Sequence, residues 1–199
     1  WGSEHAPKII VTENGKSYRR FGWETDADSA EYAEFLQSFL PAVKSFMKEK
    51  QLLDNCLFHI SDEPDEKHIE SYRKAVQTVL PLLKGCKTFD ALSEYSFYSE
   101  GLVQIPVPDN EHAEEFYRNG VSERWVYYCC GQLNRVCNRM IAMPSYRNRA
   151  LGLQLFRYQI SGFLHWGYNF WFNYLSRKPI NPFFTTDAGQ NFPAGDPFL

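Results

Sequence analysis

Residues 55–64 read NCLFHISDEP, and this stretch decides the fold class. Asn55 to Ile60 is a short apolar run without alternation, which is typical of a strand buried on both faces of a parallel sheet. Apolar residues at helical spacing follow from residue 69 to residue 83, and Gly85 closes that helix. A strand followed directly by a helix is one β/α unit.

The same alternation of strand and helix continues downstream. We expect further strands at residues 88–92, 102–107, 124–129 and 162–167, with helices at residues 111–118 and 145–161. This order predicts an α/β fold in which helices cover a parallel sheet. A complete eight-stranded barrel takes about 250 residues. About five parallel strands in 199 residues therefore predict the C-terminal part of a (β/α)8 TIM-type barrel. An open doubly wound sheet is the alternative, although no glycine-rich phosphate loop follows any strand.

The segment before residue 55 predicts two additional elements. Asn14-Gly15 lies between two runs within residues 8–23, which is the strongest short-range signal for a β-hairpin. Asp28 and Glu31 have the spacing of a capping box, and apolar residues from 32 to 47 recur at helical spacing, with a bend expected near Pro41.

Both ends of the chain look cut from something longer. We therefore expect residues 1–199 to be a single, truncated domain with an N-terminal β-hairpin.

Charge and cysteine content exclude several classes of function. The formal net charge is −3, so the chain lacks the basic field that binds nucleic acid or an anionic membrane surface. No run approaches the ~18 consecutive apolar residues of a spanning helix. The five cysteines are odd in number and lack CxxC spacing, so neither a disulfide framework nor a zinc site is predicted. We expect a soluble chain, and its compartment depends on whether a signal peptide precedes it, as in a secreted or periplasmic protein.

Aromatic residues make up 17% of the chain, and many fall outside any regular core pattern. Sugar-binding clefts use such rings because the apolar face of a pyranose stacks on them. An aromatic-rich core is the competing interpretation.

The candidate chemistry lies in Asp62 and Glu63, at the C-terminal end of the strand that residues 55–60 predict. In a barrel this is the face where active sites are built. Two close carboxylates raise the pKa of one of them, so one group can act as an acid while its neighbour stays ionised. Either residue could instead cap the next helix. His59 precedes Asp62 by three residues, but no second histidine cluster completes a ligand set, so we predict no metal or other cofactor.

The motifs of the chain resemble the catalytic domain of glycoside hydrolase family 123. The resemblance covers nearly the whole chain and is carried by HISDEP (59–64), WVYYC (125–129), RNR (147–149), HWGYN (165–169) and GD (195–196). It implies a retaining β-N-acetylgalactosaminidase in which the acetamido oxygen of the substrate attacks the anomeric carbon. The resemblance assigns Asp62 to orient and stabilise the acetamido group, and Glu63 to act as general acid and base.

Further substrate contacts are expected from the same face of the barrel. Trp166 and Tyr168 would line the acetamido pocket or the sugar ring, and Asn169 would bond a hydroxyl. Tyr127 and Tyr128 point to opposite sides of their strand, so only one of them can face the interior and bond the acetamido oxygen.

Two histidines complete the predicted site. His5 would follow a strand that precedes the chain, and His59 stands in the central motif. Arg147 and Arg149 are better explained as surface charges at the start of a helix.

Two alternatives to this enzyme stay open at the level of sequence. A non-catalytic carbohydrate-binding or structural barrel remnant would show the same aromatics and fold. A glycosidase with a protein nucleophile would need another carboxylate about 5 Å from Glu63, and Glu94 is a candidate. In each case the expected partner is a glycan or glycoconjugate, and we also expect the incomplete barrel to self-associate through its open sheet edges.

Overall fold

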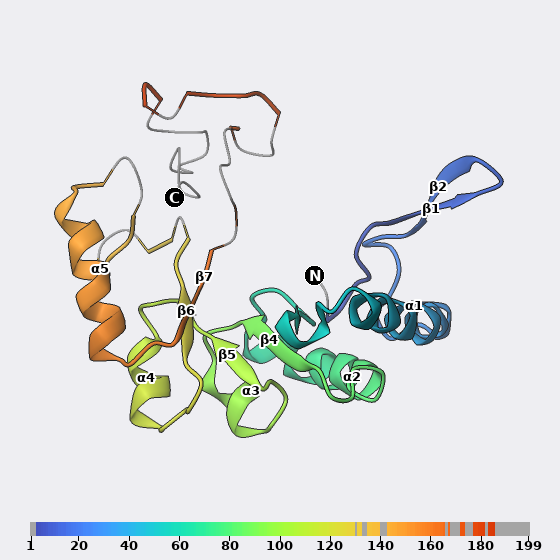
Figure 1. Cartoon of the computed structure of the whole chain (residues 1–199), viewed down its shortest axis with the longest axis horizontal. Coiled ribbons are helices and arrows are strands. Elements are labelled where there is room, and N and C mark those ends of the chain that lie inside the picture. Colours follow the sequence, from blue (N-terminus) through green and yellow to red (C-terminus); the bar gives the residue numbers. More distant parts are fainter. Residues whose placement is uncertain are drawn as a thin grey trace. The chain divides into compact units, whose positions relative to one another are not determined.

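The computed structural model describes residues 3–129, 131–132, 135–139, 143–165, 167, 172–173, 177–181 and 183–185. The chain divides into two compact units, Trp1–Pro106 and Val107–Leu199, and each unit is described by itself. Figure 1 labels the helices and strands of both units. Three predicted site residues, Trp166, Tyr168 and Asn169, lie outside the described residues.

The first unit combines a hairpin, a long helix and the beginning of the β/α series. Its elements are β1 (Ile9–Glu13), β2 (Lys16–Phe21), α1 (Ala30–Glu49), β3 (Leu57–Phe58), α2 (Ile69–Val79), β4 (Lys87–Ala91), α3 (Tyr95–Ser99) and β5 (Ile105–Val107), which ends in the second unit. Single 3-10 turns stand at Leu53–Asn55 and Glu66–His68. The sequence did not predict α3, because five residues are too few to show a helical period.

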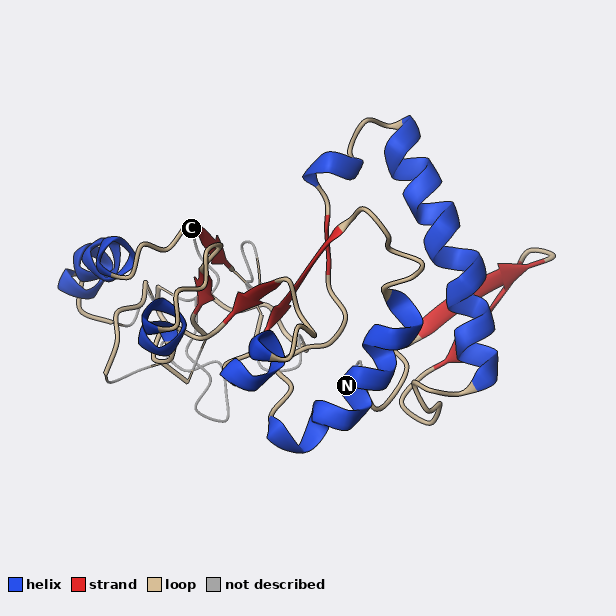
Figure 2. Ribbon diagram, turned by 90° about the horizontal axis from the view of Figure 1, so that it is seen from below, coloured by secondary structure: helices blue, strands red, loops and turns tan. Residues whose placement is uncertain are grey.

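The predicted hairpin is confirmed. Strands β1 and β2 pair antiparallel, and Asn14 and Gly15 adopt φ values of 51° and 77°, which a two-residue hairpin turn of this kind requires. Phe21 at the end of β2 is buried against Tyr32 and Phe35 of α1, with ring centroids 5.4 and 5.2 Å away. The base of the hairpin therefore packs against α1, and Figure 2 shows the two strands crossing the helix.

The long helix is confirmed, but its predicted cap is wrong. Ser29 is the N-cap of α1 and makes no side-chain cap hydrogen bond, while the side chain of Asp28 accepts from Lys74 of α2 at 2.8 Å. Tertiary pairing with α2 thus replaces the local capping box. Pro41 lies inside the helix, as expected.

Each predicted strand of the β/α series is present, although most are shorter than expected. Strands β3, β4 and β5 are neighbours in this order, and β3 pairs parallel with β4 through Leu57↔Lys87 and Phe58↔Thr88. Helix α2 follows β3 and ends at Val79, before the expected residue 83. Its fully buried Tyr72 packs edge-on against Phe97 of α3.

The second unit continues the same pattern with α4 (Ala113–Arg118), β6 (Trp125–Tyr127), α5 (Tyr146–Arg157) and β7 (Gly162–Leu164). Strands β6 and β7 are parallel, and Asp109 forms a parallel bridge with Tyr127 on the other side of β6. The fold is therefore mixed α/β with sequential parallel strands. A closed or partial barrel is not established, since the described strands belong to separate sheets.

Candidate active site

The turn that carries Asp62 and Glu63 follows β3, as predicted. Because β3 and β4 run parallel, their C-terminal ends lie at the same edge of the sheet, and residues 59–63 come next to Asp90 and Ala91. Both Asp62 and Glu63 are exposed to solvent. This edge is where open and closed α/β sheets place their ligands.

Asp90 binds the turn from β4. Its side chain is completely buried, and Oδ1 accepts hydrogen bonds from the N–H groups of Ile60 at 2.7 Å and Ser61 at 3.1 Å. Oδ1 also lies 2.6 Å from Nδ1 of His59, and Oδ2 accepts from the hydroxyl of Tyr72. A buried carboxylate requires such partners, because an uncompensated charge away from water is strongly unfavourable.

His59 lies between two carboxylates. Its Nδ1 faces Asp90, and its Nε2 lies 3.9 Å from Oδ1 of Asp62. Burial by itself lowers the pKa of His59, but the hydrogen bond to Asp90 and the charges of Asp90 and Asp62 outweigh it, so the pKa is raised above its ordinary value. The two carboxylates therefore stabilise the imidazolium form relative to that of a free histidine side chain.

The backbone of Glu63 is held in an uncommon conformation. Its φ is 43°, in the left-handed region that non-glycine residues rarely adopt, and its N–H donates to the carbonyl of Ala91 at 2.9 Å. Such strain costs about 1–3 kcal/mol and is concentrated at functional sites. The conformation makes Glu63 a candidate for a functional rather than a structural carboxylate.

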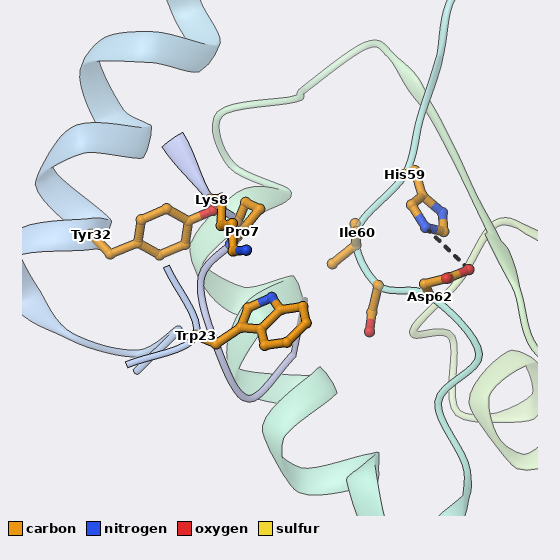
Figure 3. A pocket seen from close by; sticks show the side chains of 8 residues that line it. Pro7, Lys8, Trp23, Tyr32, His59, Ile60 and Asp62 are labelled. Atoms are coloured by element: carbon orange, nitrogen blue, oxygen red, sulfur yellow. Dashed lines mark ion pairs between the residues drawn. The ribbon is translucent and has the colours of Figure 1, made fainter. Parts of the chain in front are cut away.

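Two adjoining cavities share Ser61 and Asp62. The acidic cavity, of ≈ 450 Å³, is lined by Asp62 and Glu63 together with Ser3, Glu4, His5, Pro64 and His68. The aromatic cavity, of ≈ 430 Å³, is lined by Asp62, Ser61, His59 and Ile60 on one side and by Pro7, Lys8, Trp23 and Tyr32 on the other (Figure 3). Each volume is in the range of small-ligand pockets.

The aromatic cavity, which Asp62 also lines, contains the indole ring of Trp23 and the ammonium group of Lys8. Trp23 is 54% exposed, and Nζ of Lys8 lies 5.1 Å from the centre of its indole ring. Figure 3 shows Trp23 and Tyr32 across from His59 and Asp62, with Ile60 between them. An exposed indole face beside polar groups is suited to stacking a pyranose ring.

The alternative in which Asp62 or Glu63 caps the next helix is excluded. Asp65 is the N-cap of the 3-10 turn Glu66–His68, where its side chain accepts from Lys67 N–H at 3.2 Å and its own N–H donates to His68. Asp62 and Glu63 precede this cap and line the acidic cavity instead.

The predicted site residues fall into three groups. His5, His59, Asp62 and Glu63 come together in the first unit, where a bridge between His5 and Asp26 holds the N-terminal segment at the acidic cavity. Tyr127 and Tyr128 belong to the second unit. The third group is Trp166, Tyr168 and Asn169, which lie outside the described residues.

Of the two tyrosines, Tyr128 occupies a core position. It is completely buried and packs with Leu151 of α5 and with the ring of Phe163, 5.3 Å away. Tyr127, 9% exposed, is the member of the pair that points to the other side of β6. Arg147 and Arg149 lie in the first turns of α5, and Arg149 is exposed, as expected of a surface charge.

Three residues of this region were missed by the sequence analysis: Asp90, Tyr72 and Trp23. A charged residue within the predicted buried strand of residues 88–92 is the signal that could have identified Asp90. Trp23 is the last residue of the predicted hairpin segment 8–23, and a large ring at the edge of a short hairpin is the signal that could have identified it.

Metal-ligand clusters and membrane-spanning helices are both absent from the described part of the chain. There, no group of three His, Cys, Asp or Glu side chains is arranged to hold a metal ion. Likewise, none of the helices described is long and apolar enough to cross a membrane.

Comparison with known proteins identifies the family of the chain and a solved structure of similar fold. The family model described as the catalytic domain of glycoside hydrolase 123 matches residues 1–199. No curated protein matches the chain. A solved structure of a family 123 glycoside hydrolase from Clostridium perfringens, studied for the hydrolysis of glycolipid glycans, has a similar fold with a TM-score of 0.66 at 16% identity. The similarity covers 96% of this chain and 33% of the other, so the chain spans about a third of that relative's length.

Proposed function

The chain belongs to the catalytic-domain family of glycoside hydrolase 123, and on this basis we propose that it removes terminal β-linked 2-acetamido sugars, foremost N-acetylgalactosamine. The observation that carries the proposal is the pair Asp62 and Glu63, which line one acidic cavity in a turn that β4 holds in place. Glycans of glycolipids are candidate substrates, since the relative from Clostridium perfringens was studied for their hydrolysis.

The proposed reaction is retaining and uses the acetamido group of the substrate as nucleophile. Its carbonyl oxygen attacks the anomeric carbon while the bond to the leaving oxygen breaks and Glu63 donates a proton to that oxygen. Positive charge then develops near the acetamido nitrogen, where the carboxylate of Asp62 stabilises it. Water next attacks the anomeric carbon while the bond from that carbon to the acetamido oxygen breaks, which restores the acetamido group. Glu63 accepts the proton of the water, and the two inversions retain the configuration.

The aromatic cavity extends the proposed site beyond the acidic one. We assign Trp23 to stack on a sugar ring, because its indole is exposed and lines a cavity that also contains Asp62. Lys8 lies beside this indole, so it would favour a substrate whose polar or anionic substituents lie near Trp23.

Other parts of the proposal rest on family membership and not on geometry. They are the (β/α)8 barrel to which residues 1–199 would contribute as one domain, and the sugar contacts of Trp166, Tyr168, Asn169 and one of the pair Tyr127 and Tyr128. His5 differs from these residues because it lines the acidic cavity together with Glu63.

An assay of the protein with aryl 2-acetamido-β-glycosides of the galacto and gluco series tests the proposed function. We expect release of the aryl group, a β-configured first product by NMR, and no cleavage of the matching 2-hydroxy glycosides. Glu66→Gln is a matched control, because this exposed carboxylate lies in the same segment but lines neither cavity. Failure to cleave any member of the panel would favour a carbohydrate-binding module without turnover.

A further inference from the structure

The end of β4 binds almost every backbone N–H of the turn that carries the proposed catalytic pair. Asp90 accepts from Ile60 and Ser61 with its side chain, and its neighbour Ala91 accepts from Glu63 with its carbonyl. Three of the four N–H groups from residue 60 to residue 63 are therefore held by two consecutive residues. This arrangement fixes the direction in which Asp62 and Glu63 leave the backbone.

The same carboxylate also fixes a side chain that faces Asp62. Asp90 holds the ring of His59 at Nδ1, 2.6 Å away, and this leaves Nε2 directed at Oδ1 of Asp62 at 3.9 Å. His59 thus faces one carboxylate oxygen of the exposed Asp62. Figure 3 shows the pair joined across the turn.

We propose that Asp90 and His59 are positioning residues, which hold the turn and the carboxylate of Asp62 in the orientation that the 2-acetamido group requires. This inference rests on the proposed function. It adds Asp90 to the site and gives His59, already one of the predicted site residues, a role in positioning. Preorganised orientation of this kind contributes to catalysis because a misplaced group must otherwise be reoriented in the transition state.

The charges around His59 make the inference testable. In the described part of the chain, the charged groups that face its ring are Asp90 of β4 and Asp62 of its own turn. Tyr72 of α2 reaches the other oxygen of Asp90, and burial together with that carboxylate raises the pKa of Tyr72, so its hydroxyl remains a donor.

Loss of the charge on Asp90 lowers the pKa of His59. Loss of the Tyr72 hydroxyl leaves Asp90 one donor fewer, which strengthens its pairing with His59 and shifts that pKa upward.

The experiment compares Asp90→Asn with Tyr72→Phe, because both remove a hydrogen bond of the same buried carboxylate. The protein is labelled in its histidine rings, His59 is titrated by NMR, and kcat and KM are measured on an aryl 2-acetamido-β-glycoside. For Asp90→Asn we expect kcat to fall about tenfold or more, with a smaller change in KM and with His59 titrating at lower pH. For Tyr72→Phe we expect a less stable fold, but a kcat near wild type and a titration of His59 at or above its wild-type pH.

Each outcome decides between positioning and structural support. The inference would be wrong if Asp90→Asn and Tyr72→Phe lost kcat equally and the pKa of His59 did not shift in opposite directions in the two variants. Asp90 would then only support the fold. If Asp90→Asn does not fold, His59→Gln is tested in its place. In His59→Gln, Asp90 still accepts hydrogen bonds from the backbone of Ile60 and Ser61 and from Tyr72. A wild-type kcat in His59→Gln would overturn the inference. A wild type that cleaves no substrate would instead refute the proposed function, while the titration would still show whether Asp90 controls His59.

Discussion

Asp62 and Glu63 are neighbours in the sequence, yet the turn gives them different surroundings. Asp62 forms an ion pair with His59 on one side of the turn. Glu63 has a left-handed backbone and reaches only the acidic cavity, whereas Asp62 lines both cavities. These different environments are what a division between charge stabilisation and proton transfer requires.

Glu63→Gln should separate substrates by their leaving groups. Without the acid, kcat on poorly activated glycosides should fall by about 10²-fold or more, whereas substrates with a good leaving group should keep much of their rate. The swap is isosteric, so the free energy of unfolding should hardly change. Steady-state kinetics on aryl glycosides of graded leaving-group pKa checks this. Equal losses across the series would contradict a general acid, and Glu66→Gln should behave as wild type.

Asp62→Asn should distinguish substrate assistance from a protein nucleophile. Turnover should fall by about 10²–10³-fold, because the charge that stabilises the intermediate is lost, while no covalent sugar forms on the enzyme. A cyclic thiazoline analogue of the sugar should inhibit the wild type and inhibit Asp62→Asn more weakly. The exposed Asp54→Asn is the control. Detection of a glycosyl–enzyme ester by mass spectrometry would refute the mechanism even if Glu63 keeps its role.

Trp23→Ala should weaken substrate binding more than it slows the chemistry. Loss of the stacking face should raise KM by about threefold to tenfold with a smaller effect on kcat. Tyr18→Ala is the matched control, because Tyr18 is an exposed ring on the same hairpin and lines neither cavity. A KM that stays at the wild-type value in Trp23→Ala would remove the indole from the proposed site.

At the scale of elements, the pairing of β6 with β7 depends on a glycine. Gly162 is the pairing partner of Trp125, and a Cβ at this position would overlap the indole ring. Gly162→Ala should therefore destabilise the fold by about 1–3 kcal/mol. Gly152→Ala, in open space on α5, should instead stabilise it by about 0.5–1 kcal/mol. Denaturant unfolding gives the free energy of unfolding of both variants. Similar changes in Gly162→Ala and Gly152→Ala would contradict the prediction and show that β6 and β7 can separate to admit a methyl group.

The elements themselves followed from local patterns wherever those patterns were long enough. The hairpin was identified by Asn14-Gly15, and the 20-residue helix α1 by apolar residues that repeat from residue 32 to residue 47. The cap of α1 was predicted wrongly because Asp28 pairs with Lys74, 46 residues away. Short-range signals cannot reveal a partner that only the folded chain brings near.

At the scale of the molecule, we expect self-association to involve α5, which exposes three large apolar side chains. Tyr146, Leu153 and Phe156 share one side of the helix and are 67%, 73% and 84% exposed. We expect sedimentation velocity of residues 1–199 to show association that increases with concentration, because a second copy would bury this apolar face. Leu153→Lys with Phe156→Lys should shift the chain toward monomer, whereas Asn148→Lys, an exposed polar position on the same helix, should not. A monomer at all concentrations would contradict the expectation.

The sequence alone was sufficient for the order of β/α units, for the family and for the location of the candidate catalytic pair. Each of these depends on short-range information: apolar runs, turn residues and a motif of six consecutive residues, HISDEP at 59–64. Folding decided which groups surround that motif. Asp90 lies 28 residues beyond Asp62 in the sequence, and it comes next to His59 only because β3 and β4 pair in parallel. Trp23 and His5 reach the cavities through the hairpin and the bridge to Asp26. Contacts of this kind are set by strand register and chain topology, and no periodicity within a single segment encodes them.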